Sequence, residues 1–435
     1  MQKVMGMGLR ALNRFAGWPL VDKLKLRKPS ERVIYLASRS GFRTATAVSR
    51  SFSGAAKSDK PARLPKHSDP GLFDLTPSDE QQMLREAVQA FAGGELRKAA
   101  AAADSACGAP PELLKGAGEL GITLMGVPEA HGGAGSERSA TTNVLVAEAM
   151  AHGDMGLAVA CLAPSAVSTA LVLWGDAQQQ AKYLPEFVGE KIPAAALAVL
   201  EPRPLFDPFA LQTRAVKSGD GYVLNGVKSM VPLAAQAELF VVAAELEGNG
   251  PALFIIESST AGLSVEAEPA MGLRAASTGR LLLNDVQLPA GSLLGEGKGE
   301  VYAECINLAR IAWCSLAVGT SQAVLDYVIP YVNERVAFGE PISHRQSVAF
   351  AVANIGIELE GMRLLTYRAA SRAEQDKPFT RETALARRLC ADKGMQIGND
   401  GVQLLGGHGY VKEHPVERWY RDLRAAGLME GVLLV

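Results

Sequence analysis

The spacing of hydrophobic and polar positions changes twice along this chain, and each change indicates a new kind of structure. From about residue 71 the apolar positions recur at helical intervals, as in Met83, Val88 and Phe91, which follow the helix-start residues 76–80. Four more helices are predicted in this segment, over residues 111–120, 139–152, 163–173 and 177–188. Residues 71–190 are therefore expected to form an all-α domain.

Between residues 191 and 295 the spacing changes to a period of two, which is typical of strands. Hairpin turns are predicted at 219–221 (Gly-Asp-Gly) and at Asn225-Gly226, because these residues tolerate the positive φ that tight hairpins need. Five strands are predicted, over residues 211–216, 222–224, 239–243, 252–256 and 280–283. A small antiparallel barrel or sandwich is expected here.

Long helical patterns return from residue 296 and continue to residue 435. They predict helices over residues 302–335, 347–375 and 380–406. The order gives an α+β fold that is mostly α, with an N-terminal all-α domain, a middle antiparallel β-barrel domain and a C-terminal helical bundle. No run of about 18 uncharged apolar residues is identified, so no membrane-spanning helix is expected.

Residues 1–70 differ from the rest because Lys and Arg recur while acidic residues are scarce. Two amphipathic helical segments, near residues 4–15 and 31–43, are predicted to precede a linker over residues 51–68. One interpretation is a transit peptide of about 50 residues and a mitochondrial matrix protein. A second is a cytoplasmic protein of a bacterium, peripheral to the inner membrane, whose residues 1–68 contact an anionic surface. A solvated basic extension is the third.

Composition narrows the classes of function. Hydrophobic residues make up 48% of the chain and charged residues 21%, which is typical of a soluble globular protein. The net charge of −2 gives no reason to expect a nucleic-acid partner. The five cysteines are scattered without C-x-x-C spacing, and the six histidines show no ligand pairing. Neither a disulfide framework nor a metal site is expected.

The most informative stretch lies near the C-terminus. A helix-spaced run ends at Gln403, and Gly406 and Gly407 follow, where glycine can stop a helix without a side-chain clash. Such a turn leaves N–H groups that can face an anionic ligand. A charged helix start over residues 415–422 and the carboxylate of Glu430 in an apolar tail come next. Taken singly, these features are equally those of a helix cap and of a surface glutamate.

The ordered combination Q-x-x-G-G-x-G-Y, P-x-E-R-x-x-R-D and E-G resembles the acyl-CoA dehydrogenase family, and the resemblance extends from about Leu75 to the C-terminus. It implies an α–β–α fold with a four-helix C-terminal bundle. It also implies FAD as cofactor, an acyl-CoA substrate, an electron-transferring flavoprotein as partner, and a homodimer or homotetramer. The family's reaction removes a proton from Cα of the thioester while a hydride leaves Cβ for FAD.

In that family the glutamate of the E-G pair is the catalytic base, and the matching residue is Glu430. A thioester α-proton is too weakly acidic for a free carboxylate, so the base must be desolvated, which the apolar neighbours Met429 and Val432 suit. The family's alternative base position, just before Arg310, holds Ala309. We assign Arg310 to the catalytic site as a buried charge that positions the base loop; an interhelical ion pair is the alternative.

A second motif, R-x-x-F-G followed by Q, begins at Arg335. By resemblance, Arg335 reaches the pyrophosphate of a neighbouring subunit's FAD and Phe338 packs against its adenine end, because a planar guanidinium pairs two phosphate oxygens. The same FAD pocket is expected to include Gln346, Gln403, Gly406 and Gly407. Such sharing implies at least a homodimer. A helix end followed by glycine is the structural alternative.

Several positions depart from the family. Leu200, Met230 and Pro232 stand where the family offers the flavin hydroxyls, an aromatic ring or N–H groups, and Val432 replaces the threonine of E-G-T. The sequence ends at Val435, before the helix that follows in the family. Two functions are therefore predicted. One is FAD-dependent acyl-CoA dehydrogenation; the alternative is a non-catalytic relative that acts as a membrane-associated partner or acyl-CoA binder.

Overall fold

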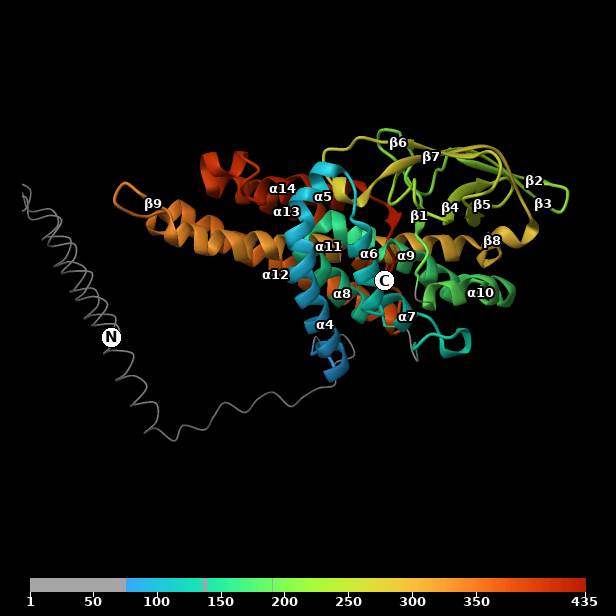
Figure 1. The fold of residues 1–435 in the computed structure, drawn as a ribbon, viewed down its shortest axis with the longest axis horizontal. Coiled ribbons are helices and arrows are strands. Elements are labelled where there is room, and N and C mark those ends of the chain that lie inside the picture. Colours follow the sequence, from blue (N-terminus) through green and yellow to red (C-terminus); the bar gives the residue numbers. More distant parts are fainter. Residues whose placement is uncertain (1–75, 136–138, 190) are drawn as a thin grey trace, which may run out of the picture. The chain divides into compact units, whose positions relative to one another are not determined.

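The structure, a computed structural model, describes residues 76–135, 139–189 and 191–435 (Figure 1). The predictions for residues 1–70, including the transit peptide and the membrane-surface helix, lie outside the described residues. The described part belongs to one compact unit that begins at residue 73. The predicted α–β–α order and mostly helical fold class are confirmed. The division into domains at residues 190 and 295 stays a prediction.

Helices cover most of residues 79–183. α4 (Asp79–Phe91) begins with a capping box, in which Ser78 and Gln81 each accept the other's backbone N–H through their side chains. α9 (Met155–Trp174) begins after Asp154, whose carboxylate accepts the N–H of Leu157. The other α-helices here are α5 (Arg97–Ala106), α6 (Pro111–Glu119), α7 (Ile122–Gly126), α8 (Ala140–Gly153) and α10 (Ala177–Tyr183).

Two helices contradict the expectation that no segment has membrane-spanning length and polarity. α9 and α11 (Gly299–Glu334) are long and apolar enough to cross a membrane, by length and composition alone. Their apolar windows are 72% and 78% buried inside the structure, as the core helices of a globular protein are. The helix predicted from residue 163 begins eight residues earlier, and Pro164 lies inside it.

The middle segment contributes most of a nine-stranded mixed sheet. Its main path runs β11-β1-β4-β2-β3-β7-β6, and β5 pairs with β4 and β8. Both β1 and β2 run parallel to β4, so the sheet is not wholly antiparallel as the strand pattern predicted. The strands are β1 (Ala195–Ala198), β2 (Arg214–Ser218), β3 (Gly221–Val231), β4 (Leu239–Leu246), β5 (Gly250–Glu257), β6 (Leu263–Ala267), β7 (Gly279–Leu288), β8 (Leu293–Leu294) and β11 (Gly431–Val432).

One predicted hairpin is present and the other is wrong. The turn at Gly219-Asp220 joins β2 to β3. Asn225 and Gly226 instead lie inside β3, where the register with β7 shifts as it does at a β-bulge. A Cβ at Gly226 would lie 2.6 Å from the Cα of Thr213. Glycine is needed here for a close approach of two strands and not for a turn.

α11 is the central helix of the C-terminal part. α12 (Gln346–Glu374), α13 (Thr380–Leu405) and α8 pack against it, so the N-terminal segment supplies one of the four long helices (Figure 1). The approach to α8 is close, because a Cβ at Gly319 would lie 2.0 Å from the carbonyl oxygen of Glu148. The remaining elements are β9 (Val336–Ala337), β10 (Glu340–Pro341), α14 (Val416–Leu423) and α15 (Ala425–Leu428).

The E-R-x-x-R-D part of the sequence motif has a structural role in α14. Arg418 donates to the fully buried Asp154 at the start of α9, with Nε and Oδ2 2.8 Å apart. Arg421 pairs with Asp104 of α5 at 2.9 and 3.0 Å. Asp422 accepts the N–H of Leu273 at 2.6 Å, and burial next to Asp154 raises its pKa to about 7. These contacts tie α14 to the N-terminal helices and to the connection between β6 and β7.

Candidate active site

Glu430 lies between α15 and β11 with only 7% of its side chain exposed. Arg310, in the fourth turn of α11, binds the carboxylate in a bidentate manner, with Nη2 2.8 Å from Oε1 and Nε 3.0 Å from Oε2. The predicted pair is therefore brought together across 120 positions of sequence.

A second arginine, Arg387 of α13, also binds Glu430 and was missed by the sequence analysis. Its Nη2 lies 3.1 Å from Oε1 of Glu430, and its Nη1 donates to the carbonyl of Met429 at 2.8 Å. The side chain also donates to the carbonyl of Gly427 at 3.3 Å. Arg387 thus fixes both the carboxylate and the backbone of residues 427–430. Its position in α13 carried no sequence signal, because the partner loop is 43 residues away.

The two carboxylate oxygens of Glu430 differ in their contacts. Oε1 accepts from both arginines, whereas Oε2 accepts from Nε of Arg310 alone among the described residues. A carboxylate oxygen has two lone-pair positions, so Oε2 retains one that can take a proton. Burial removes water from this position. The arrangement suits a general base whose orientation is fixed by charge-assisted hydrogen bonds.

The backbone after Glu430 is strained and closely packed. Gly431 has φ 79°, and a Cβ there would lie 2.4 Å from Cγ2 of Val199. Val432 has φ 52°, an unfavourable value for a β-branched residue. The N–H of Leu433 donates to the carbonyl of Gly431 at 2.6 Å, which closes a γ-turn around Val432. Such strain persists only where the surrounding structure holds it, and here β11 is held by its pairing with Leu197 and Ala198 of β1.

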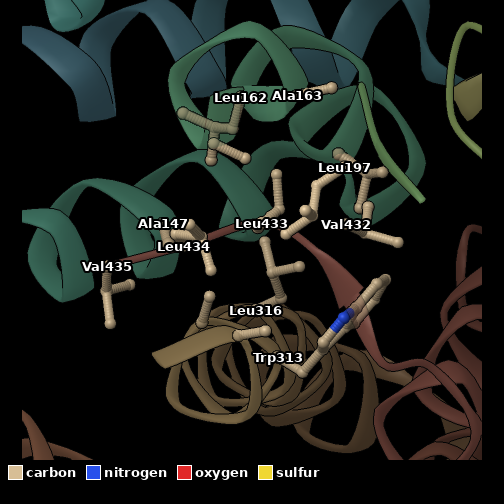
Figure 2. Packing of buried hydrophobic residues seen from close by; sticks show 14 of the residues in the cluster. Ala147, Leu162, Ala163, Leu197, Trp313, Leu316, Val432, Leu433, Leu434 and Val435 are labelled. Carbon is tan, nitrogen blue, oxygen red and sulfur yellow. The ribbon is translucent and has the colours of Figure 1, made fainter. Parts of the chain in front are cut away.

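Residues 432–435 fill the apolar space beside Glu430. All four are at most 7% exposed, and they lie between α8, α9 and α11 (Figure 2). Figure 2 shows them among side chains of these helices and of β1, including Ala147, Leu162, Ala163, Leu197, Trp313 and Leu316. The pocket next to the candidate base is therefore occupied by the chain itself in this conformation.

The six residues predicted to bind FAD lie together on the surface, away from Glu430. Arg335 caps α11, Phe338 is 97% exposed in the β9–β10 turn, and Gln346 begins α12. The hydroxyl of Tyr331 bonds the carbonyl of Leu405 at 3.3 Å, which joins this end of α11 to the end of α13. Gln403, Gly406 and Gly407 are exposed there. Arg310 and Arg335 are 25 residues apart on α11, about 37 Å at the helical rise.

The six surface residues fit FAD better than the positions expected to face the flavin ring, Leu200, Met230 and Pro232. An exposed arginine beside Gly406 and Gly407, where an added Cβ would meet nothing within 4 Å, fits a nucleotide presented by another chain. The ring-facing positions fit less well. The N–H of Met230 is donated to Glu268 at 2.6 Å, and Pro232 has no N–H. Leu200 is apolar, so the described residues offer the flavin ring fewer free donors than the family pattern implies.

The end of β1 is braced by a buried ion pair. Glu201 accepts from the N–H groups of Gln212 and Thr213 and from Lys228, whose Nζ lies 3.0 Å from Oε1 and 3.1 Å from the carbonyl of Val199. Burial lowers the pKa of Lys228 to about 8, although Glu201 opposes the shift. Burial alone would raise the pKa of Glu201, but Lys228 and the two N–H groups outweigh it and lower it. The contacts of the pair therefore outweigh the cost of burying the charge of Glu201 but not that of burying the charge of Lys228.

No group of three or more His, Cys, Asp or Glu side chains is arranged to hold a metal ion within the described part of the chain.

Comparisons with known proteins agree with this architecture. Family models match residues 78–191 (acyl-CoA dehydrogenase, N-terminal domain), 196–286 (middle domain) and 297–433 (C-terminal domain). The mouse short-chain specific acyl-CoA dehydrogenase, mitochondrial, is 36% identical over 81% of this chain and 87% of its own length. A Bacillus subtilis protein that carries the name of an acyl-CoA dehydrogenase, YngJ, is 33% identical over 82% of this chain and 96% of its own.

Solved structures give the same result. Butyryl-CoA dehydrogenase from Megasphaera elsdenii superimposes with a TM-score of 0.76 and 31% identity, covering 82% of this chain and 96% of that chain. A chain from a structure described as the electron transferring flavoprotein of Acidaminococcus fermentans has a TM-score of 0.76 at 29% identity, with the same coverage. The relatives are FAD-dependent oxidoreductases of fatty-acid metabolism. This chain belongs to the acyl-CoA dehydrogenase family.

Proposed function

We propose that this protein catalyses the flavin-dependent α,β-dehydrogenation of an acyl-CoA thioester, with Glu430 as the base. The observation that carries the proposal is the buried carboxylate of Glu430, fixed by two arginines with one lone-pair position of Oε2 left free. The α-proton of the thioester goes to Oε2, and the electron pair that remains forms the double bond as a hydride leaves Cβ. FAD, when bound, supplies the acceptor for that hydride.

The protein's own residues act by orientation and by excluding water. Arg310 and Arg387 hold the carboxylate in one rotamer, so that the base does not lose freedom during the reaction. Met429 and Val432 on either side are each 2% exposed, which keeps the surroundings of Glu430 apolar. The purified protein should convert at least one of butyryl-CoA, hexanoyl-CoA and octanoyl-CoA to its 2-enoyl-CoA with an artificial electron acceptor.

FAD binding is proposed to use Arg335, Phe338, Gln346, Gln403, Gly406 and Gly407 of a second copy of the chain. Replacing Arg335 by alanine should lower the flavin content of the purified protein by about tenfold, since a bidentate arginine–phosphate contact is charge-assisted. The flavin-to-protein absorbance ratio measures this. Arg214→Ala, which removes an exposed arginine from β2, is the matched control. Equal flavin content in both variants would leave the Arg335 motif with only a structural role.

The non-catalytic alternative is favoured by one specific observation, the burial of residues 432–435 in the space beside Glu430. An acyl chain that entered this space would have to displace them. In this alternative the protein keeps the family fold but acts as a membrane-associated partner or acyl-CoA binder. A colourless protein that FAD cannot reconstitute would support it, and a flavin absorbance band that acyl-CoA bleaches would exclude it.

An electron-transferring flavoprotein is proposed as the partner that reoxidises the enzyme. Relatives of the chain include a mitochondrial protein and a bacterial protein, which fit the mitochondrial and the bacterial interpretation respectively. We further propose that residues 1–68 contact an anionic membrane surface, with each Lys or Arg near the surface contributing about 1 kcal/mol. Binding to phosphatidylserine vesicles should weaken as salt rises and should disappear when residues 1–68 are deleted. Undiminished binding by the deleted form would contradict this.

A further inference from the structure

A cavity of about 320 Å³ lies against the face of α9 that carries residues 160, 161 and 164. This volume is in the range of small-molecule sites, about 300–1,000 Å³. Residues 433–435 and Leu162 line a smaller neighbouring pocket, and Ile122 and Ser165 line both spaces (Figure 2). Glu430, Arg310 and Arg387 are not among the described residues that line the cavity. Its apolar lining includes Leu114, Ile122, Ala160, Pro164, Ile192 and Leu233.

Two hydroxyl groups in this apolar lining have no hydrogen-bond partner among the described residues. The side chain of Thr123 is buried, and its hydroxyl has no hydrogen-bond partner in the described part of the chain. The same holds for the hydroxyl of Ser165. Buried hydroxyls are usually paired, and orphaned ones point to a missing ligand or water.

The exposed part of the lining carries positive charge. Lys115 of α6 and Lys191, which precedes β1, both line the cavity and are exposed to solvent. The ammonium of Lys115 lies 3.7 Å from the carboxylate of Glu119, and solvent screens this exposed ion pair. No acidic residue occurs among the described lining residues. An apolar interior with two ammonium groups at its mouth complements a molecule that has an apolar chain and an anionic end.

We propose that this cavity is a second binding site, for a single-chain amphipathic anion of the fatty-acid carboxylate class, separate from the thioester site at Glu430. The chain lies among the apolar residues, and the carboxylate lies at the mouth near Lys115 and Lys191. The hydroxyls of Thr123 and Ser165 donate to any oxygen that reaches them or to a water that enters with the ligand. The proposal goes beyond the dehydrogenation and does not require it.

The binding is tested by calorimetric titration of the full-length protein with dodecanoate below its micellar concentration. Gly118 of α6 lines the cavity, and a Cβ there would make an ordinary 3.4 Å contact with Ile192. Gly118→Leu should therefore fold, fill the cavity and weaken binding at least tenfold. Gly93→Leu, where an added Cβ meets nothing within 4 Å, is the matched control and should bind normally.

Two further variants test the chemistry of the two ends. Thr123→Val removes the orphaned hydroxyl with little change in volume. If the hydroxyl serves the ligand, the variant should bind dodecanoate about fivefold more weakly. If the hydroxyl is merely buried, the variant should gain thermal stability and bind dodecanoate as the parent does. Lys115→Gln with Lys191→Gln should abolish the salt dependence of binding. Dodecanol, which has the same chain without the charge, should bind more weakly than dodecanoate.

Cys161 reports the location of the bound molecule. It lines the cavity and is partly exposed, and burial raises its pKa to about 12, so it reacts slowly as a thiol. In a Cys107→Ser background the other three cysteines are buried. Dodecanoate should slow the reaction of Cys161 with methyl methanethiosulfonate severalfold, as measured by mass spectrometry.

Two results would overturn the proposal. One is the absence of dodecanoate binding, or equal binding by the folded Gly118→Leu variant. The other is binding that butyryl-CoA displaces competitively while Cys161 stays unprotected. That second result would assign the fatty carboxylate to the thioester site, and it would leave the proposed dehydrogenation intact. Conversely, a failure of the dehydrogenation assay would not affect the binding measured here.

Discussion

Replacing Glu430 by glutamine should reduce the rate of acyl-CoA dehydrogenation by about 10³-fold, within the range of about 10²–10⁴ that a general base contributes. Glutamine has nearly the same shape and can still accept a hydrogen bond from Arg310, but its amide cannot take the α-proton. Flavin content should change little, since the predicted FAD residues lie at the other end of α11. Thermal stability should fall, because Arg310 and Arg387 lose the charge of their shared carboxylate partner. The measurement is steady-state turnover with a saturating acyl-CoA and an artificial acceptor.

A matched control for this variant is Glu148→Gln. Glu148 is also a mostly buried glutamate bound to an arginine, with Arg363 at 3.0 Å and the hydroxyl of Tyr367 at 2.9 Å. It lies on α8 and forms no part of the candidate site. Its substitution should alter stability and leave the turnover of folded protein within about twofold, as expected of a site with no role in catalysis. A parallel loss of activity in both variants would show that Glu430 acts through the fold and not through proton transfer.

Replacing Lys228 by methionine should lower the free energy of unfolding by about 3 kcal/mol at pH 7, because it removes the nearer cation of the buried Glu201 carboxylate and leaves only Arg203, 3.7 Å away. Methionine has a similar length and restores the packing of the stem. Two backbone N–H groups still bind Glu201, which keeps the loss near the lower end of the range for a broken buried pair. The strand end at Val199 should loosen as well, since it loses its bond to Nζ. Urea unfolding measures the change.

The same variant has a pH signature. The folded-state pKa of Lys228 is about 8, below its value of about 10.4 in an unfolded chain. Between these values the unfolded state binds the proton and the folded state does not, so this group's contribution to stability rises with pH and is lost as pH falls through about 8. The stability of the parent protein relative to Lys228→Met should therefore grow between pH 8 and pH 10. A constant difference over that interval would contradict the buried ammonium.

The fold was predictable where the hydrophobic period was long and unbroken. α12 and α13 begin and end within one residue of their predicted limits, because both run as amphipathic patterns bounded by loops. α9 was predicted to begin too late, since Pro164 resembles a helix start although the capping residue is Asp154. β1 was missed because all four of its residues are buried and show no alternation. β11 was missed because a strand of two residues is too short to show any alternation of buried and exposed positions.

The candidate site was predictable in its central residue but not in its surroundings. Glu430 and Arg310 were identified from motif positions, and the structure brings their side chains together. Arg387 could not be found, because its role depends on how α13 packs against the loop that carries Glu430. Residues 432–435 fill the adjacent space because β11 pairs with β1, and no local sequence pattern predicts this pairing. The parts of the site that the motifs did not predict, Arg387 and residues 432–435, are therefore placed by long-range packing.

The central claim, that Glu430 takes a proton from an acyl-CoA while the flavin is reduced, is tested most directly by anaerobic rapid mixing. Protein reconstituted with FAD is mixed with butyryl-CoA, hexanoyl-CoA or octanoyl-CoA, and the flavin absorbance band is followed in time. We expect the band to bleach in a single fast phase with at least one of these thioesters, and to bleach about 10³-fold more slowly in Glu430→Gln. A flavin band that none of these thioesters bleaches, or equal bleaching rates in both proteins, would contradict the account.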